Sequence, residues 1–425
     1  MRLGTFLLQL TLAFAASAHA AEPPDALPDD LDALSLADKA PTTPPQAVQA
    51  WRIFAEGAFG QTKIGGADPR FESSRASLDV RFDAHVAPGL RAVFSDRFDR
   101  LHSNGKPSAD DVNTLREAYL SWARTDEQIV DFGRVNVRRG AAFGYNPTDW
   151  FKEGALRSIV SPDPMVLREN RQGTVVLQGQ QLWSAGSLTA TFSPRLARQP
   201  NPGTFSLNVG ATNPRNRWLL TGSTKFSDRF NSELLLYGGD DTRPQVGLNV
   251  SGLISDAAVV FGEFTAGKGR SLVAQALQLD QARHQQERAA VGLTYTTALN
   301  LSITAEAEYN SAAPGRGQWN ALPGIDPYGR LRVLATQPSL QDLPMRRALF
   351  VYAKWKDLLV RQFDVSAFVR GDSETHSRAQ WLEARYHWDS AEIALQWQLY
   401  SGSSGSFYGS IPQRRAIELA LRYYL

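Results

Sequence analysis

The chain ends with the stretch Arg415-Ala-Ile-Glu-Leu-Ala-Leu-Arg-Tyr-Tyr-Leu425, in which polar and apolar side chains alternate. The odd positions from Ile417 to Leu425 carry only apolar or aromatic side chains, whereas the even positions include Glu418 and Arg422. Successive side chains of a β-strand point to opposite faces. The stretch therefore predicts a terminal strand with one apolar face and one polar face.

The same alternation recurs along most of the chain. Near residue 78, for example, apolar Ala76, Leu78 and Val80 alternate with polar Arg75 and Asp79. Many of these segments have about the length that a tilted strand needs to cross a membrane. We expect about eighteen strands, which cover residues 51–60, 74–86, 90–98, 115–124, 129–135, 174–183, 187–193, 218–226, 230–237, 245–254, 257–266, 288–296, 300–310, 347–356, 362–372, 379–388, 391–400 and 416–425.

Tight turns and longer connections follow one another in strict alternation between these segments. Short turns on the periplasmic rim and long loops on the outer rim produce this order in outer-membrane barrels. It also gives an even number of strands, with both chain ends on the periplasmic side. The longer connections are predicted at residues 61–73, 101–113, 136–173, 194–216, 238–244, 267–287, 311–346, 373–378 and 401–415.

These two patterns predict an all-β fold, a transmembrane antiparallel up-and-down β-barrel of about 18 strands (roughly 16–18) formed by residues 51–425. The alternative is a large secreted β-sandwich or β-propeller, which also contains many short strands. Sandwiches do not sort their loops by length in this way, and a propeller needs a blade repeat that the sequence lacks. Both observations favour the barrel.

The first fifty residues differ from the rest. Residues 1–20 combine Arg2, an apolar run and the sequence Ala18-His-Ala20, which is the pattern of a cleaved secretory signal peptide. Residues 21–50 hold six acidic residues and a single lysine, with recurring prolines. This composition predicts a disordered acidic leader in the periplasm.

The composition excludes several other classes. The chain has no cysteine, so it has neither disulfides nor thiolate metal sites. Its 43% hydrophobic content and formal net charge of +2 are ordinary values, which suit a barrel whose inner face is polar. No later segment is apolar enough to be a membrane-spanning helix.

The chain resembles the large porin-like β-barrel proteins of the Gram-negative outer membrane. The resemblance rests on the signal sequence, the amphipathic strands and the final Tyr423-Tyr-Leu425, although such proteins usually end on Phe. The segment from Gly133-Arg134 through Gly144-Tyr-Asn-Pro-Thr-Asp149 to Arg168-Glu-Asn-Arg-Gln-Gly173 looks like a segment of several uncharacterised or polymer-export barrels. The resemblance implies an outer-membrane location and contact with lipid and lipopolysaccharide. It also leaves open association as a homotrimer.

Charged residues of both signs occupy the predicted inner face. They would be costly in lipid, so they face either an open aqueous pore, where they select solutes by charge, or each other in a filled lumen. The width of an eighteen-stranded barrel favours the pore. The candidates on this face are Arg75, Asp79, Arg81, Asp83, Glu306, Glu308, Arg370, Glu383 and Arg385.

Arginines gather in and around the long connection 136–173. The guanidinium group matches the geometry of carboxylates, sulfates and phosphates. We therefore expect either an inward-folding constriction loop that admits anionic solutes, or a surface loop that touches lipopolysaccharide phosphates. The constriction candidates are Arg134, Arg138, Arg139, Arg157, Arg168 and Arg171. In the other long connection, 311–346, Trp319, Tyr328, Arg330 and Arg332 give a weaker hint of sugar binding.

An enzyme is not indicated. The histidines after the signal peptide, His85, His102, His284, His376 and His387, lie in no recognisable catalytic or metal-binding motif. Phosphate-binding, dinucleotide-binding and calcium-binding loops are absent from the sequence, so we expect no cofactor, no metal and no nucleic acid partner.

The sequence thus predicts an outer-membrane channel for the passive passage of small polar solutes. The arginines favour anionic solutes among these. The alternative is an outer-membrane docking or scaffold component of an envelope or polymer-export machine, whose leader, residues 21–50, binds a periplasmic partner. Deleting this leader separates the two, because a channel keeps its conductance whereas a docking protein loses its partner.

Overall fold

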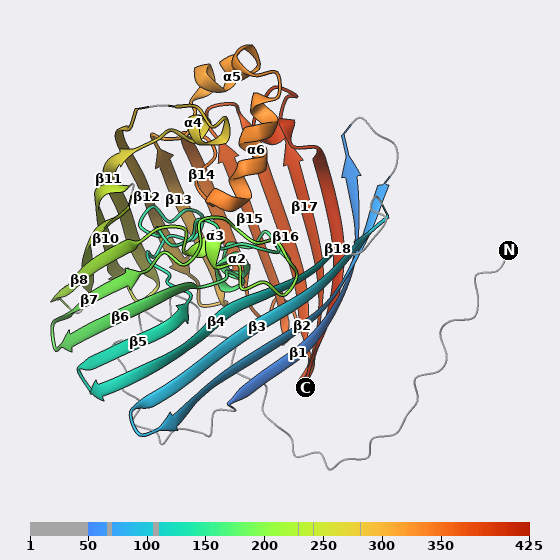
Figure 1. Ribbon diagram of the computed structural model, residues 1–425. Helices are drawn as coiled ribbons and strands as arrows, with labels where there is room; N and C mark the ends of the chain where they lie inside the picture. Colours follow the sequence, from blue (N-terminus) through green and yellow to red (C-terminus); the bar gives the residue numbers. More distant parts are fainter. Residues whose placement is uncertain (1–49, 66–69, 105–109, 228, 241, 281) are drawn as a thin grey trace, which may run out of the picture.

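The structure is a computed structural model that describes residues 50–65, 70–104, 110–227, 229–240, 242–280 and 282–425. These residues form one antiparallel sheet of eighteen strands that closes on itself, because β1 pairs with both β2 and β18. Both ends of the sheet therefore have a partner, which leaves no open edge and makes a barrel (Figure 1). The predicted barrel fold is confirmed. The predicted signal peptide, and the leader except for Ala50, lie outside the described residues.

Each strand pairs with its neighbours in sequence. The strands are β1 (Trp51–Ile64), β2 (Arg70–Ala87), β3 (Leu90–Ser103), β4 (Asp110–Thr125), β5 (Gln128–Val135), β6 (Thr174–Trp183), β7 (Gly186–Ser193), β8 (Arg217–Ser227), β9 (Phe230–Gly239), β10 (Thr242–Ser255), β11 (Ala258–Gly269), β12 (His284–Thr296), β13 (Leu301–Asn310), β14 (Arg347–Trp355), β15 (Phe363–Asp372), β16 (Ser377–His387), β17 (Ala391–Ser401) and β18 (Gln413–Tyr424).

The short helices of the described residues all lie in the connections of one rim. They are α2 (Pro164–Glu169), α3 (Val209–Thr212), α4 (Leu272–Ala276), α5 (Arg316–Ile325), α6 (Gly329–Leu340) and the 3₁₀ turn η1 (Tyr408–Ser410). Figure 1 shows α4, α5 and α6 at the upper rim, whereas the chain ends at the lower rim. Within the described part of the chain, no helix is both long and apolar enough to cross a membrane.

The strict alternation of short and long connections is wrong in three places, two of them on the rim where long loops were expected. Only two residues separate β9 from β10, and only four separate β15 from β16. The reason is that several strands continue beyond their apolar segments, so that some outer loops become tight hairpins. On the opposite rim, the connection of β14 to β15 takes seven residues, 356–362, where a tight turn was expected.

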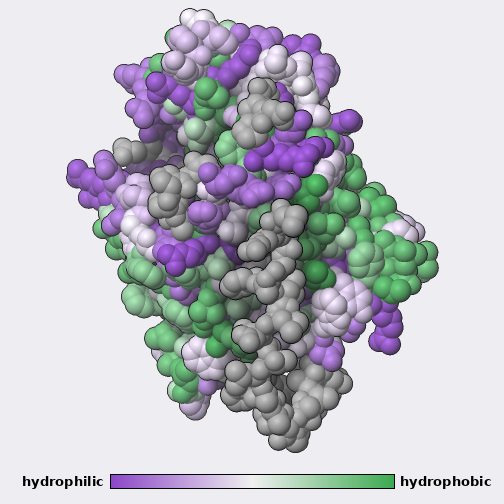
Figure 2. Space-filling view, turned by 90° about the vertical axis from the view of Figure 1, so that its right-hand side faces the viewer, coloured by the Kyte–Doolittle hydropathy of each residue, from purple (hydrophilic) through white to green (hydrophobic). Residues whose placement is uncertain are grey.

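The two faces of the wall follow the alternation in the sequence. On β18, Leu419 and Leu421 are exposed on the outside, whereas Arg422 turns inward to Glu56. In Figure 2, hydrophobic surface gathers over the middle and lower parts of one side, and hydrophilic surface covers the upper part. An apolar outer belt below a polar outer rim is typical of a barrel that sits in a membrane.

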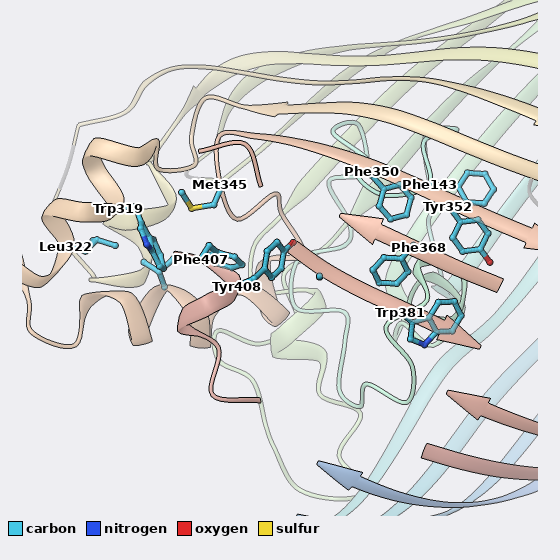
Figure 3. Packing of buried hydrophobic residues seen from close by; sticks show 12 residues of the cluster. Phe143, Trp319, Leu322, Met345, Phe350, Tyr352, Phe368, Trp381, Phe407 and Tyr408 are labelled. Carbon is cyan, nitrogen blue, oxygen red and sulfur yellow. The ribbon is translucent and has the colours of Figure 1, made fainter. Parts of the chain in front are cut away.

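The apolar core lies inside the barrel, toward the rim that carries the helices. Trp319 and Leu322 of α5 are completely buried and pack near Phe407 and Met345. A second group on the inner wall includes Phe350, which Figure 3 shows beside Phe143, Tyr352, Phe368 and Trp381. The loops of this rim therefore fill part of the lumen.

Candidate functional site

The long connection 136–173, here called loop L3, folds into the barrel. The backbone N–H of Phe143 donates to Glu306 Oε1 at 2.5 Å, and that of Gly144 donates to Glu306 Oε2 at 2.9 Å. Because Glu306 lies on β13, and L3 leaves the wall at β5, the loop reaches the far side of the lumen. Figure 1 shows this irregular segment within the barrel.

A second carboxylate, Glu263 of β11, holds the start of this segment. It accepts hydrogen bonds from the Ala142 N–H at 2.7 Å, Thr148 Oγ1 at 2.9 Å and Asn146 Nδ2 at 3.1 Å. Gly140 passes this carboxylate with φ +87°, and a Cβ at this position would lie 2.2 Å from Glu263 Oε1. Only glycine fits this approach, because other residues rarely adopt that φ and would also collide with the carboxylate.

The end of L3 contacts both sides of the barrel. Arg75 of β2 donates to the Val160 carbonyl at 3.3 Å, and Tyr352 of β14 donates to Asp163 at 3.3 Å. Arg116 of β4 donates to Asn170 Oδ1 at 3.1 Å. The loop is thus held from several sides of the barrel and narrows the lumen between them.

The six arginines predicted for the constriction separate into three groups. Arg138 is exposed, and Arg139 forms an ion pair with Glu233 at 3.3 Å. Arg168 and Arg171 are buried within the loop, where Arg171 meets Asp149 at 2.5 Å. Arg134 and Arg157 instead bind backbone carbonyls of residues 202–207 at the edge of the wall.

The wall opposite β11 and β13 carries a network of ion pairs. Glu56 of β1 accepts from Arg75 at 3.0 Å, from Arg97 at 2.8 Å and from Arg422 at 2.9 Å. Asp79 continues the network through Arg97, at 3.6 Å, and through Arg116, at 2.5 Å. Charges of both signs therefore alternate along this wall.

The remaining candidates of the inner face have similar partners. Arg385 bridges Glu383 at 2.9 Å and Glu392 at 2.5 Å. Asp83 binds Arg91 at 2.6 Å and Arg81 at 3.5 Å. Across the lumen, Arg370 pairs with Glu308 at 3.2 Å and also binds the Gly144 carbonyl of L3. The candidates on the strands thus form clusters on the wall and against L3.

A second long loop packs onto L3. This connection, residues 311–346 and here called loop L7, contains α5 and α6. Its Gln341 accepts from Arg171 at 2.9 Å and donates to the Lys152 carbonyl at 2.5 Å. Its Asp342 accepts from the Tyr145 hydroxyl at 2.6 Å. Of the residues in this contact, Arg171 was a predicted candidate, whereas Tyr145, Lys152, Gln341 and Asp342 were not predicted.

The sugar-binding hint in L7 is not supported by the geometry. Trp319 is completely buried with its ring 5.4 Å from that of Phe407, and the Arg330 guanidinium lies 5.5 Å above its centre. Tyr328 is 66% exposed and Arg332 pairs with Asp326 at 2.8 Å. Trp319 is therefore unavailable to stack on a sugar ring, because it forms part of the core.

A cavity of about 210 Å³ lies between L3, α6 and the inner wall. Four aromatic residues contribute to it, namely Phe143, Tyr145, Phe350 and Phe368. Its charged lining residues are Lys152, Arg168, Arg171, Asp342 and Arg370. Four cationic side chains and one carboxylate thus surround a partly aromatic space.

The charges beside the cavity influence one another. Burial alone would raise the pKa of the Asp342 carboxyl, but Arg288 and Lys152 hold that pKa below its ordinary value. Burial lowers the pKa of the Lys152 ammonium group. Asp342 is shared by two cations, Arg288 at 3.4 Å and Lys152 at 3.9 Å. Arg171 and Arg370 have acidic partners of their own, Asp149 and Glu308, behind the cavity lining, so the lining itself carries more cations than carboxylates.

Two lining groups offer further donors. Gln337 Nε2 and Arg370 Nε are buried, and neither has a hydrogen-bond partner among the described residues. Buried donors usually have a partner, and an anion or polar group in the cavity would supply one. Arg168, Arg171 and Arg370 of this lining were predicted as candidates. The lining residues of L7 were not predicted, because L3 and L7 lie far apart along the chain.

Solved structures share this fold. OccK5 (OpdH) of Pseudomonas aeruginosa has a TM-score of 0.54 and 9% identity, over 88% of this chain and 97% of that chain. OccAB1 of Acinetobacter baumannii has a TM-score of 0.54 and 10% identity, over 88% and 96%. The outer membrane protein opdK from P. aeruginosa has a TM-score of 0.50 and 8% identity, over 89% and 99%.

No protein-family model and no curated protein matches the sequence. At this low identity the likeness concerns architecture, and it agrees with the closed eighteen-stranded sheet and the apolar outer belt. The chain has the fold of the large porin-like barrels of the bacterial outer membrane.

Proposed function

We propose that this protein is a passive channel in the bacterial outer membrane for small polar solutes, with a preference for anions. The observation that carries the proposal is the course of L3, which crosses the lumen and is held on β11 and β13. A loop in this position narrows a wide barrel to a size that discriminates among solutes.

The cavity between L3 and L7 supports the anionic preference. It has four cationic side chains, and its volume of about 210 Å³ suits a small molecule rather than a polymer. The aromatic rings beside the cations provide an apolar surface for the carbon skeleton of such a solute. The ion pairs on the opposite wall carry both signs, so the preference is expected to arise mainly at the loops.

Ion selectivity in planar bilayers tests this preference. Replacing Arg138 and Arg139 with Ala removes two positive charges from L3, and we expect the ratio of anion to cation permeability to fall. Arg361→Ala is the control, because this exposed arginine lies in the β14–β15 connection on the opposite rim. Unchanged selectivity in the L3 variant would remove these two residues from the filter.

The proposal includes no catalytic role, cofactor or metal. It does include association of the barrels into a homotrimer. The alternative, a docking component that binds a periplasmic partner, depends on residues 21–50, nearly all of which lie outside the described part of the chain. A chain without these residues should conduct as the full chain does, whereas a docking protein without them should lose its partner in a pull-down.

A further inference from the structure

Three basic side chains, here called the basic row, lie next to one another near the upper ends of β18, β1 and β2. In the register of these strands, Lys63 of β1 lies opposite Arg415 of β18 and also opposite Arg70 of β2. All three side chains are exposed. Directly opposed residues have their Cβ atoms about 4.5–5.5 Å apart on one face of the sheet. Figure 1 shows these strand ends at the rim opposite the C-terminus.

The alternation along the strands places the basic row on the outside of the barrel. Side chains two residues apart point to the same face of a strand. Arg415 therefore shares its face with Leu419, which is 47% exposed on the outer wall. Lys63 shares its face with Phe59, which is 52% exposed there. Arg70 lies opposite Lys63 and thus on the same face.

The basic row lacks a counter-charge within the described part of the chain. There, no side chain forms an ion pair or a hydrogen bond with the charged groups of Lys63, Arg70 and Arg415. Glu72 is exposed on the same face, opposite Gln61, but its carboxylate forms no ion pair with the row. Like charges directly opposite each other in a sheet are destabilising, so an anion from outside the chain would stabilise this arrangement.

A fourth cation lies at the end of the basic row. Just above Lys63 the register of β1 with β18 shifts, so that Ile64 lies opposite Gln413 and Arg414 is skipped. A Cβ at Gly65 would lie 2.6 Å from Arg414 Nε, so this arginine extends beside the end of β1. Bulges of this kind re-aim a side chain, and here the bulge adds a positive charge next to the row.

The basic row lies at the upper boundary of the apolar belt. Below Arg415 on β18, Ile417, Leu419, Leu421 and Tyr423 are each about half exposed on the outer face. At the rise and tilt of membrane strands, the eight residues from Tyr423 to Arg415 correspond to a height of about 20 Å. Because the apolar belt of such barrels is about 25 Å tall, the row lies where the outer lipid headgroups begin.

We infer that the basic row, together with Arg414, binds the phosphate groups of lipopolysaccharide in the outer leaflet. Guanidinium groups bind phosphate oxygens through their fork geometry, and an ammonium group binds them as a point charge. The phosphates of this lipid lie directly above its acyl chains, as the basic row lies above the apolar side chains of β18 and β1. A free anion would meet only the row, whereas the lipid meets both parts of the surface.

The inference goes beyond the proposed function. It rests on the outer-membrane location in that proposal, but it does not depend on conduction through the lumen.

Arg378 of β16 provides a matched control. This arginine is also exposed near the upper rim, on the face of Leu382, which is 41% exposed on the outer wall. Its neighbours in the register are Gly371 and Ser401, and its Nε donates to Ser401 Oγ at 3.2 Å. Arg378 is thus an outer arginine that lies outside the basic row.

Binding of fluorescently labelled lipopolysaccharide to the purified full chain in detergent micelles tests the site. In one variant, Lys63→Gln, Arg70→Gln and Arg415→Gln are combined. We expect its affinity for the lipid to fall by about a hundredfold, because each basic residue near an anionic surface contributes about fivefold. Arg378→Gln should change the affinity little. An unmodified protein that does not bind the probe, or a triple variant with undiminished affinity, would overturn the inference.

Competition on the unmodified protein identifies the chemistry without any variant. Unlabelled lipopolysaccharide should displace the probe, whereas the same lipid without its phosphates, or inorganic phosphate at equal concentration, should not. Displacement by inorganic phosphate would reveal a site for free anions, and displacement by the dephosphorylated lipid would reveal binding through acyl chains alone. Either result would contradict the inference.

Conductance of the triple variant keeps this test apart from the channel proposal. The basic row lies on the outer face, so we expect the variant to conduct as the unmodified protein does. Unchanged conductance also shows that the variant has folded and inserted, so that its loss of lipid affinity belongs to the row. A failure of the unmodified protein to conduct would contradict the channel and leave the lipid site in place.

Discussion

Arg422 of β18 donates two hydrogen bonds to Glu56 of β1, both to Oε2, from Nε at 3.1 Å and from Nη2 at 2.9 Å. The two residues face each other in the register of the strand pair that closes the barrel. Glu56 is 8% exposed and also accepts from Arg75 and Arg97. A single carboxylate thus connects the last strand to the first, second and third strands.

We therefore predict that Glu56→Gln weakens the closure of the barrel. The substitution leaves three guanidinium groups without their shared counter-charge, and breaking a buried ion pair costs about 3–5 kcal/mol. The unfolding of the barrel in denaturant, followed by circular dichroism, should shift to a lower concentration. Glu418→Gln is the control, since Glu418 is more exposed and, among the described residues, pairs with Arg75 alone, at 3.1 Å. Its shift should be clearly smaller.

The position of L3 depends on Gly140. Gly140→Ala would place a methyl group against the Glu263 carboxylate and disfavour φ +87°. We expect the loop to leave the wall, with a change in single-channel conductance and more frequent current fluctuations. Gly57→Ala is the matched control, because a Cβ there meets nothing within 4 Å. Identical current traces for both variants would contradict the role assigned to Gly140.

Glu306 should control the mobility of the same loop. Glu306→Ala removes the acceptor of the Phe143 and Gly144 N–H groups, and each buried group left unpaired costs about 1–3 kcal/mol. We expect faster hydrogen exchange in residues 142–148, with little change in β1 and β18. Exchange as slow as in the unmodified protein would show that other contacts suffice to hold L3.

The stability of L3 should depend on pH through Asp163. Burial raises the pKa of this carboxyl to about 6, and its Oδ1 accepts from the Met165 N–H at the start of α2. The folded protein therefore holds this proton more tightly than the unfolded chain, whose pKa is near 3.8. The resulting stability is present at low pH and is lost as the pH rises toward 6, by at most about 3 kcal/mol.

Asp163→Asn keeps an acceptor for Met165 but cannot lose a proton. Its unfolding in denaturant, measured from pH 4 to 7, should lack this part of the pH dependence. The unmodified protein should lose stability over the same range relative to the variant. Parallel profiles for the two proteins would show that Asp163 titrates normally.

The barrel could be predicted from the sequence because its alternation is local. A strand between lipid and water repeats its polarity every two residues, so the terminal strand and most others were found from their own residues. The upper ends of β2 and β4 were not predicted, because above the membrane both faces of these strands meet polar surroundings. The alternation of inward and outward side chains is also interrupted near Arg116. A bulge in β4 shifts its register against β3 between Ser95 and Asp96.

The candidate site was predictable only in part. The arginines of 136–173 left open an inward loop and a surface loop, and a count of arginines could not separate Arg171 in the loop from Arg157 at the wall. The alternation along β5 could have placed Arg134 on the outer face of the barrel, because Arg134 follows Phe132 by two residues and Phe132 is exposed on that face. The contacts of L7 with L3, such as that of Asp342 with Tyr145, join residues 197 positions apart and leave no local pattern.

If L3 narrows an open channel that prefers anions, single-channel recording should show it. The purified full chain is recorded in a planar bilayer under a salt gradient. We expect discrete current steps and a reversal potential of the sign for anion preference. A bilayer that stays silent despite inserted, folded protein, or a reversal potential of the opposite sign, would contradict it.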